Sequence, residues 1–355
     1  AAGTTAMPTG APILVDGSRP RSGCWTRIIA STAAGTAFMT EITHRALATN
    51  SISLHVAEAG AGPLVLLLHG FPESWYSWRH QLPALAAAGW HAVAPDMRGY
   101  GRSDAPPEIA AYDQVTLAAD IAGLIDALGA ETAVVIGHDW GAPVAWHTAL
   151  LHPERCRAVA GLSVPYRGRG DRSPLAQFKA FYQDRFFYIL YFQTPGVAEA
   201  ELEADIPGFL AKFLHGASGQ APRDALLTAT KKKGDRLLDG VAMPRGLPTW
   251  LSQADLDYYA GEFTRTGLAA PLNWYRNFDR TWELTPQLAG ATITQPALYV
   301  AGELDPVLRF SPGWREKLEA GCDDLRAVVL LEGCGHWIQQ ERPAETTRAI
   351  LDFLA

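Results

Sequence analysis

The sequence predicts an α/β protein, in which a mostly parallel β-sheet carries helices on both faces and is interrupted by an inserted helical lid. Two observations support this fold class. Short apolar runs alternate with amphipathic helical patterns over residues 51–165 and again over 291–355, as in parallel sheets whose strands are joined by helices. Between these parts, residues 166–290 carry helical patterns and many aromatic residues but no clear strand. Ser252 to Asp255, for example, resembles the capping box of a helix.

The chain of 355 residues is long enough for a large core and divides into four parts. Residues 1–38 are rich in Ala, Gly, Thr and Pro and show no periodic pattern, so we expect a disordered extension. Its composition is compatible with a transit peptide. Translated upstream sequence or an artefact ahead of a natural start at Met39 are the alternatives. The first sheet part spans 39–165, the helical lid 166–290 and the second sheet part 291–355.

The first sheet part opens with a strand pattern in which Ile52, Leu54 and Val56 alternate with polar or small residues. The apolar run at 64–68 predicts a strand that is covered on both faces. Further strands are expected at 91–94, 134–137, 159–164, 296–302 and 326–332, and helices at 117–128, ending at Gly129, and from Pro343 onward.

Composition argues against several classes of partner. The formal net charge of -7 disfavours a nucleic-acid surface, which needs clustered Lys and Arg. We interpret the one basic run, at 231–233, as a solvated helix end. The apolar run at 64–68 is far shorter than the roughly 20 residues that span a bilayer, so we expect no membrane association. A small molecule is the expected partner, and a homodimer is left open.

The cysteines indicate a reducing environment. The chain has four, Cys24, Cys156, Cys322 and Cys334, without the spacing of a metal site or a disulfide framework. We therefore expect free thiols and a cytoplasmic location. Neither a metal nor a cofactor is implied.

The residues GHDWG at 137–141 stand between a β-branched run and a helical pattern, as in a nucleophile elbow, which is a tight strand-to-helix turn. Asp139 takes the central position. A serine there would form an ether with saturated carbon that water could not cleave, whereas a carboxylate forms an ester that water can cleave. Asp139 thus indicates attack on an epoxide or an alkyl halide, and the alternative is a turn with a capping Asp.

An ester on Asp139 requires a base that activates water. His336 stands out among ten histidines because it lies in the glycine-rich loop GCGHW at 333–337, directly after the last predicted strand. Loops at the carboxyl ends of parallel strands build such sites. The acidic partner of His336 should follow the preceding strand, where Glu303 and Asp305 both fit.

Ester hydrolysis passes through an oxyanion that needs two fixed hydrogen-bond donors. The backbone N–H groups of Trp140, next after the nucleophile, and of Phe71, in the loop after an earlier strand, are placed to supply them. We interpret His69 and His138 as structural histidines.

These motifs together resemble the epoxide hydrolases of the α/β-hydrolase superfamily, of the soluble epoxide hydrolase type, from about Met39 to Ala355. The match comprises HGFPESWYSWRHQ at 69–81, DMRGYGRSDAP at 96–106, GHDWG at 137–141 and GCGHW at 333–337. Two lid stretches add specificity, YFQTPGVAEAELE at 191–203 and PLNWYRN at 271–277.

The resemblance implies an α/β-hydrolase fold with a cap domain and the hydrolysis of an epoxide to a vicinal diol, with no cofactor. It implies that Asp139 forms the covalent ester and that His336 activates water. It also implies that Asp305, rather than Glu303, is the triad acid.

The family's lid contributes two tyrosines, which match Tyr188 and Tyr275 in this chain. A phenol with a pKa near 10 is neutral at pH 7 and can donate to the alkoxide that forms when an epoxide opens. Tyr191, three residues after Tyr188, is the main rival. We expect Phe71, Trp140 and Trp274 to contact a small hydrophobic epoxide, in a pocket that other lid aromatic residues also shape (Phe186, Phe187, Trp250 and Phe278).

Two other functions compete with this one. Haloalkane dehalogenases share the fold, the Asp nucleophile and the following Trp, but need a halide cradle in place of a tyrosine pair. A non-catalytic ligand receptor is also compatible with the fold. The two lid stretches favour the epoxide, and the intact set of matching positions favours an enzyme.

Overall fold

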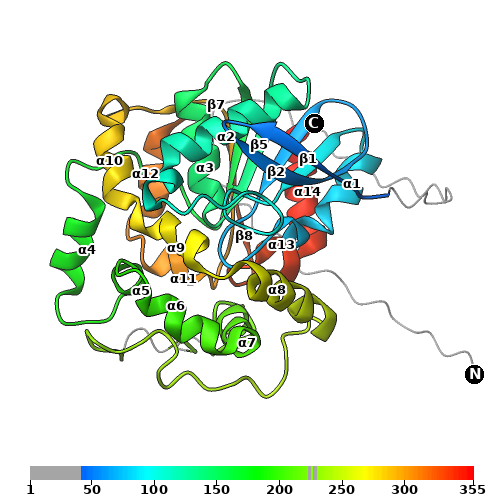
Figure 1. Ribbon diagram of the computed structural model, residues 1–355. Coiled ribbons are helices and arrows are strands. Elements are labelled where there is room, and N and C mark those ends of the chain that lie inside the picture. The colour runs from blue at the N-terminus through cyan, green and yellow to red at the C-terminus, as the bar shows by residue number, and fades with distance from the viewer. Residues whose placement is uncertain (1–40, 223–224, 227–229) are drawn as a thin grey trace, which may run out of the picture.

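The computed structural model describes residues 41–222, 225–226 and 230–355, and the extension expected at 1–38 lies outside them. Eight strands form one sheet in the order β1-β2-β4-β3-β5-β6-β7-β8 (Figure 1). Pairs β1–β2 and β2–β4 are antiparallel and all other neighbours are parallel, so the predicted fold class is confirmed. The strands are β1 (Thr43–Thr49), β2 (Ile52–Ala59), β3 (Leu64–Leu68), β4 (His91–Pro95), β5 (Ala133–His138), β6 (Cys156–Leu162), β7 (Ile293–Gly302) and β8 (Cys322–Leu331).

The sheet begins one strand earlier than the sequence suggested. Strand β1 pairs antiparallel with β2 along its whole length and forms the edge of the sheet. Most of its residues are exposed, including Arg45, whose side chain pairs with Glu58 on β2. An exposed edge strand lacks the apolar alternation that identifies a half-buried one, which is why the pattern gave no sign of it.

Alternate residues of the central strands pack against two separate layers of helices. On β3, Leu66 and Leu68 join one hydrophobic cluster, whereas Val65 and Leu67 join the other. Helices α2 (Gln114–Ala127), α3 (Gly141–Leu151) and α12 (Trp314–Gly321) contribute to the first cluster, and α1 (Gln81–Ala87), α13 (Ile338–Glu341) and α14 (Pro343–Leu354) to the second. The predicted strand at 64–68 is therefore covered on both faces.

The chain between β6 and β7 is helical, and most of these helices lie together below the sheet in Figure 1. Apart from an isolated bridge between Arg185 and Lys232, its described residues contain no strand. The predicted capping box is confirmed, because Ser252 and Asp255 cap α8 reciprocally. The helices are α4 (Pro174–Tyr182), α5 (Tyr188–Tyr191), α6 (Val197–Leu202), α7 (Ile206–Gly216), α8 (Gln253–Thr266), α9 (Ala269–Arg276) and α10 (Phe278–Leu284).

The interpretation of the basic run as a solvated helix end is wrong. Lys231 is buried outside any helix, and its Nζ donates to the carbonyl oxygens of Arg236 and Leu237. The ammonium group also lies 5.3 Å from the centre of the Phe186 ring. Backbone carbonyl groups and an aromatic face thus replace the water that a solvated lysine would keep.

The structure bears on the expectations about membrane association and about free cysteines. Within ranges 41–222, 225–226 and 230–355, no helix has the length and apolar character needed to cross a membrane. Cys156, Cys322 and Cys334 are free and buried, and Cys24 lies outside the described residues.

The parallel register brings the ends of five strands to one edge of the sheet. Leu68 of β3 pairs with Gly137 of β5, His138 of β5 pairs with Leu162 of β6, and Gly302 of β7 pairs with Leu331 of β8. The loops that follow these strands therefore meet at the same edge, and they carry every residue predicted for the nucleophile, the base and its acid.

Candidate active site

The turn that carries Asp139 is sterically demanding. Asp139 has a φ of +49°, in the left-handed region that residues other than glycine rarely adopt. A Cβ atom on Gly137 would overlap the carbonyl oxygen of Gly141, and one on Gly141 would overlap that of Leu68. Helix α3 thus begins directly against the strands, and only glycine fits on either side of this strained residue.

The structure brings Asp139, Asp305 and His336 together. Nε2 of His336 lies 3.3 Å from Oδ2 of Asp139, and Nδ1 lies 3.0 and 3.1 Å from the two carboxylate oxygens of Asp305. Asp305 follows β7 and is buried, whereas Glu303 is exposed and makes no side-chain contact with the histidine. Of the two acids that the sequence left open, only Asp305 pairs with His336.

The two carboxylates control the charge of His336. Burial alone would lower the pKa of this imidazole. The nearby charge of Asp305 and the hydrogen bonds and charge of Asp139 outweigh burial and raise the pKa of His336 well above its usual value near 6.5. The ring therefore stays protonated above that pH.

A buried polar network holds the backbone of His336. Its carbonyl oxygen accepts from Nε2 of His138 at 2.8 Å and from Oγ of Ser163 at 2.8 Å. Nδ1 of His138 lies 2.7 Å from Oε2 of Glu73, which is fully enclosed. Gln339 donates to the other oxygen of Glu73 at 2.9 Å. His138 is structural as predicted, but its partners are far away in sequence and no local pattern pointed to them.

His69 is likewise structural. Its Nδ1 lies 2.9 Å from the carbonyl oxygen of Gly70, and its Nε2 accepts from the backbone N–H of Met97 at 3.0 Å. The ring therefore fastens the loop after β3 to the loop after β4. This fixes the backbone that leads into Phe71.

Two backbone N–H groups lie next to the Asp139 carboxylate. The N–H of Phe71 donates to Oδ1 of Asp139 at 2.8 Å. A Cβ atom on Gly70 would overlap both that oxygen and the backbone nitrogen of Trp140, so Gly70 allows the two chain segments to meet. The N–H of Phe71 thus binds the carboxylate, and the backbone nitrogen of Trp140 lies beside Gly70 at the same contact.

Asp139 and His336 open into a cavity of about 260 Å³, whose wall includes Tyr188 and Tyr275. The centres of the two tyrosine rings lie 5.9 Å apart. Burial, and then the charge of Asp139, raise the pKa of both phenols well above 10, so both stay neutral and can donate. The other lining residues are mostly apolar: Phe71, Phe213, Gly216, Ala217, Leu226, Leu237, Pro306, Val307, Arg309 and Phe310.

Tyr191 points elsewhere. Its hydroxyl donates to Oε2 of Glu201 at 2.7 Å, and the residue does not line the cavity. Tyr188 and Tyr191 are the first and last residues of the four-residue helix α5, so one turn decides which ring meets Asp139.

The expected lining by lid aromatic residues needs correction. Trp274 is buried behind Trp140, 6.0 Å from it between ring centres, and donates its indole N–H to the carbonyl oxygen of Arg98. Neither residue lines the Asp139 cavity, although the ring of Trp140 packs against that of Tyr275, with 5.0 Å between ring centres. Phe186, Phe187, Trp250 and Phe278 are also absent from that wall.

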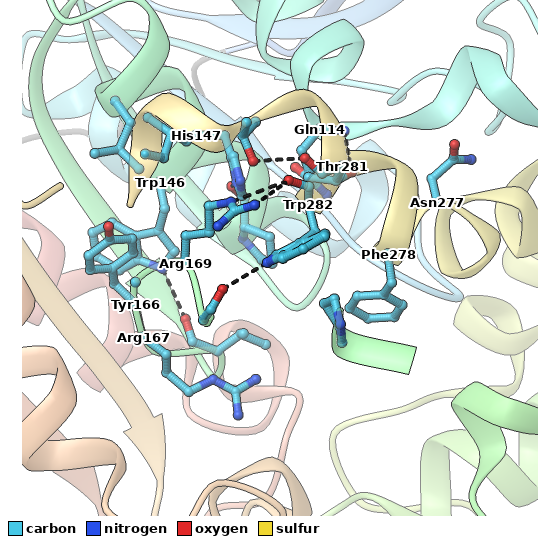
Figure 2. A pocket seen from close by; sticks show the side chains of 18 of the residues that line it. Gln114, Trp146, His147, Tyr166, Arg167, Arg169, Asn277, Phe278, Thr281 and Trp282 are labelled. Carbon is cyan, nitrogen blue, oxygen red and sulfur yellow. Dashed lines mark hydrogen bonds between the residues drawn. The ribbon is translucent and has the colours of Figure 1, made fainter. Parts of the chain in front are cut away.

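Trp140 and Trp274 instead belong to the wall of a second cavity of about 210 Å³. Figure 2 shows its other side chains, among them Trp146 and His147 of α3 and Phe278 and Trp282 of α10. Trp140 thus separates this second cavity from the tyrosines of the first, and its indole has packing partners on both sides.

Among the described residues, no group of three or more His, Cys, Asp or Glu side chains could hold a metal ion. The functional groups of this site are the carboxylates of Asp139 and Asp305, the imidazole of His336, and the phenols of Tyr188 and Tyr275. This set can perform nucleophilic and acid–base chemistry with its own groups.

Comparison with known proteins identifies the family. The sequence profile of the α/β hydrolase fold matches residues 63–343. "Epoxide hydrolase A" of Mycobacterium tuberculosis is 50% identical over 314 residues, which cover 88% of this chain and 97% of that protein. The chain belongs to the epoxide hydrolases of the α/β-hydrolase superfamily. "Epoxide hydrolase 2" of Siraitia grosvenorii is 43% identical and covers 89% of this chain and 99% of its own length.

Solved structures of epoxide hydrolases are similar throughout the same region. An epoxide hydrolase from an endophytic Streptomyces superposes with a TM-score of 0.85 at 48% identity, over 88% of this chain and 95% of that one. Epoxide hydrolase A from Mycobacterium thermoresistibile gives a TM-score of 0.82 at 50% identity, over 88% and 98%. The resemblance drawn from the motifs is therefore confirmed.

The charge of His336 provides a test of this geometry. We expect the D305N and D139N substitutions each to lower the pKa of His336, because each removes a negative charge that stabilises the imidazolium. NMR titration of the ¹³C- and ¹⁵N-labelled ring measures this directly. The matched control is E303Q, two residues from Asp305, which should leave the pKa of His336 unchanged. A shift in E303Q as large as that in D305N would contradict the assignment of the acid.

Proposed function

We propose that this chain hydrolyses small hydrophobic epoxides to vicinal diols through a covalent ester on Asp139, which water activated by His336 then cleaves. One observation carries the proposal: a single cavity contains a carboxylate on a strained turn, a histidine paired with a second carboxylate, and two neutral phenols. The family to which the chain belongs supports the same reaction.

In the first step, an oxygen of Asp139 attacks an epoxide carbon and the bond from that carbon to the ring oxygen breaks. The ring oxygen takes a proton from Tyr188 or Tyr275 and becomes a hydroxyl. The negative charge of Asp139 opposes ionisation of both phenols in the resting site. Ester formation removes that charge, so a tyrosine can give up its proton at the moment the alkoxide forms.

In the second step, His336 accepts a proton from water, and the hydroxide attacks the carbonyl carbon of the ester. Ester formation removes the charge that raises the pKa of His336 from one side, so the resting imidazolium first passes its proton to the ionised tyrosine. Its Nε2 is then free to act as a base. Asp305 keeps Nδ1 oriented. The N–H groups of Phe71 and Trp140 stabilise the oxyanion.

The acyl C–O bond then breaks and releases the diol. The two protons of the water end on the leaving oxygen of the diol and on His336, which restores the resting site. The sum is one epoxide and one water to one diol, and the residues named account for every proton transfer. The apolar cavity wall, including Phe213, Val307 and Phe310, favours an apolar epoxide.

We also propose a cytoplasmic location, because the three described cysteines are free thiols. A homodimer stays a prediction.

The tyrosine assignment predicts different effects for neighbouring residues. We expect Y188F and Y275F each to lower kcat/KM about ten- to a hundred-fold, because each removes a hydrogen bond to developing negative charge, worth about 1.5 to 3 kcal/mol. Y191F should stay close to wild type, since the Tyr191 hydroxyl bonds to Glu201 outside the cavity. Steady-state kinetics with an apolar epoxide measures all three, and an equal loss in Y191F would contradict the assignment.

The function itself is tested by trapping the ester. H336Q should form the ester and fail to hydrolyse it, so exposure to a panel of epoxides should add the full mass of the epoxide to the peptide that contains Asp139. Mass spectrometry measures the adduct, and D139N is the control that should show none. Labelling by chloroalkanes alone, with loss of the halide, would indicate a dehalogenase. Tight binding of an unreacted ligand without any adduct would indicate a receptor.

A further inference from the structure

Glu341, the last residue of α13, lies five residues after His336 and gathers four hydrogen bonds on its carboxylate. Oε2 accepts from the backbone N–H of Gly219 at 2.9 Å, from that of Gly335 at 3.1 Å and from Oγ of Ser218 at 3.2 Å. Oε1 accepts from the backbone N–H of Trp337 at 3.1 Å. Within the described part of the chain, no cation forms a salt bridge with this carboxylate.

The four donors come from two segments that are distant in sequence. Gly335 and Trp337 are the residues on either side of His336, while Ser218 and Gly219 follow α7 of the helical insertion. A Cβ atom on Gly335 would overlap the backbone nitrogen of Gly219, so the two segments are in direct contact. Glu341 thus holds the loop of His336 against Ser218 and Gly219 of the helical segment between β6 and β7.

Further bonds lie along the same contact. The backbone N–H of His336 donates to the carbonyl oxygen of Ala217 at 2.9 Å. The indole N–H of Trp337 donates to the carbonyl oxygen of Leu214 at 2.7 Å. Ala217 is also part of the wall of the Asp139 cavity. The backbone of His336 is therefore fixed on one side by His138 and Ser163, and on the other by the insertion and Glu341.

Three of the four groups that point to Glu341 are backbone N–H groups, which can only donate. A carboxylate accepts at both of its oxygens, whereas an amide in its place would offer one oxygen and an NH₂ group that cannot accept. The charge also strengthens each bond. This arrangement suits a carboxylate at position 341 and no neutral side chain of the same size.

We propose that Glu341 is a positioning residue, which fixes the loop of His336 against residues 217–219 so that Nε2 is held for the hydrolytic step. The proposal rests on the proposed function, because it concerns the water-activating role of His336. Attack on the epoxide uses Asp139 and the tyrosines, none of which touches Glu341. Loss of the carboxylate should therefore slow ester hydrolysis much more than ester formation.

The test compares E341Q with wild type and with E345Q. Glu345 lies four residues further on, in the first turn of α14, and its side chain makes no hydrogen bond within the described residues, which makes it a matched control. Rapid quenching and intact-mass spectrometry during turnover of an apolar epoxide give the fraction of enzyme held as the ester and the rates of both steps.

We expect E341Q to accumulate the ester, with hydrolysis slowed at least about tenfold and ester formation within about twofold of wild type. E345Q should behave as wild type. E341D, which keeps the charge on a shorter side chain, should recover part of the hydrolysis rate and serves as the second variant if E341Q does not fold.

A uniform loss of both steps in E341Q, or no change in either, would overturn the role of Glu341 while the H336Q ester still supports the proposed function. A wild type without turnover, together with H336Q that forms no ester, would remove both proposals. A merely destabilised variant would lose active enzyme without shifting the balance between the steps.

Discussion

The site depends on one arrangement, the imidazole of His336 held between the carboxylates of Asp139 and Asp305. Each of the three residues follows a different parallel strand, and the register of β5, β7 and β8 brings them to one edge of the sheet. Two negative charges around one buried ring favour the imidazolium in the resting state. Burial, and then the charge of Asp139, explain why the neighbouring phenols resist ionisation. Geometry and charge are thus set by the same few contacts.

This electrostatic balance links the two chemical steps. When Asp139 becomes an ester, its negative charge passes to the epoxide oxygen and then, after proton transfer, to a tyrosine. The charge that opposed ionisation of Tyr188 and Tyr275 disappears just as one of them must donate its proton, and the imidazole becomes a better base when water must be activated. A rigid setting for His336 is then essential, because its Nδ1, its carbonyl oxygen and its backbone N–H are all engaged. Only Nε2 is left to face the substrate.

The sequence predicted those features that depend on local pattern. The apolar run at 64–68, the glycines around Asp139 and the capping box at Ser252 each state a steric or hydrogen-bonding requirement within a few residues. Features that depend on contacts between distant segments gave no such signal: the exposed edge strand β1, the Glu73 partner of His138, and Trp274 behind Trp140. Local reasoning could not choose between Glu303 and Asp305 as the acid that pairs with His336. Nor could it choose between Tyr188 and Tyr191 as the tyrosine that faces the nucleophile. Only the resemblance separated them, since each pair differs in the direction of a side chain after a turn.

The most direct test of the covalent route is a single turnover in water enriched in ¹⁸O, with enzyme in excess over an apolar epoxide. If Asp139 supplies the new oxygen, the diol from the first turnover should carry no label, and the peptide that contains Asp139 should gain one ¹⁸O. Mass spectrometry of the diol and of the peptide reads both. A diol that contains ¹⁸O in the first turnover, with Asp139 unlabelled, would mean that water attacks the epoxide directly and would contradict the account.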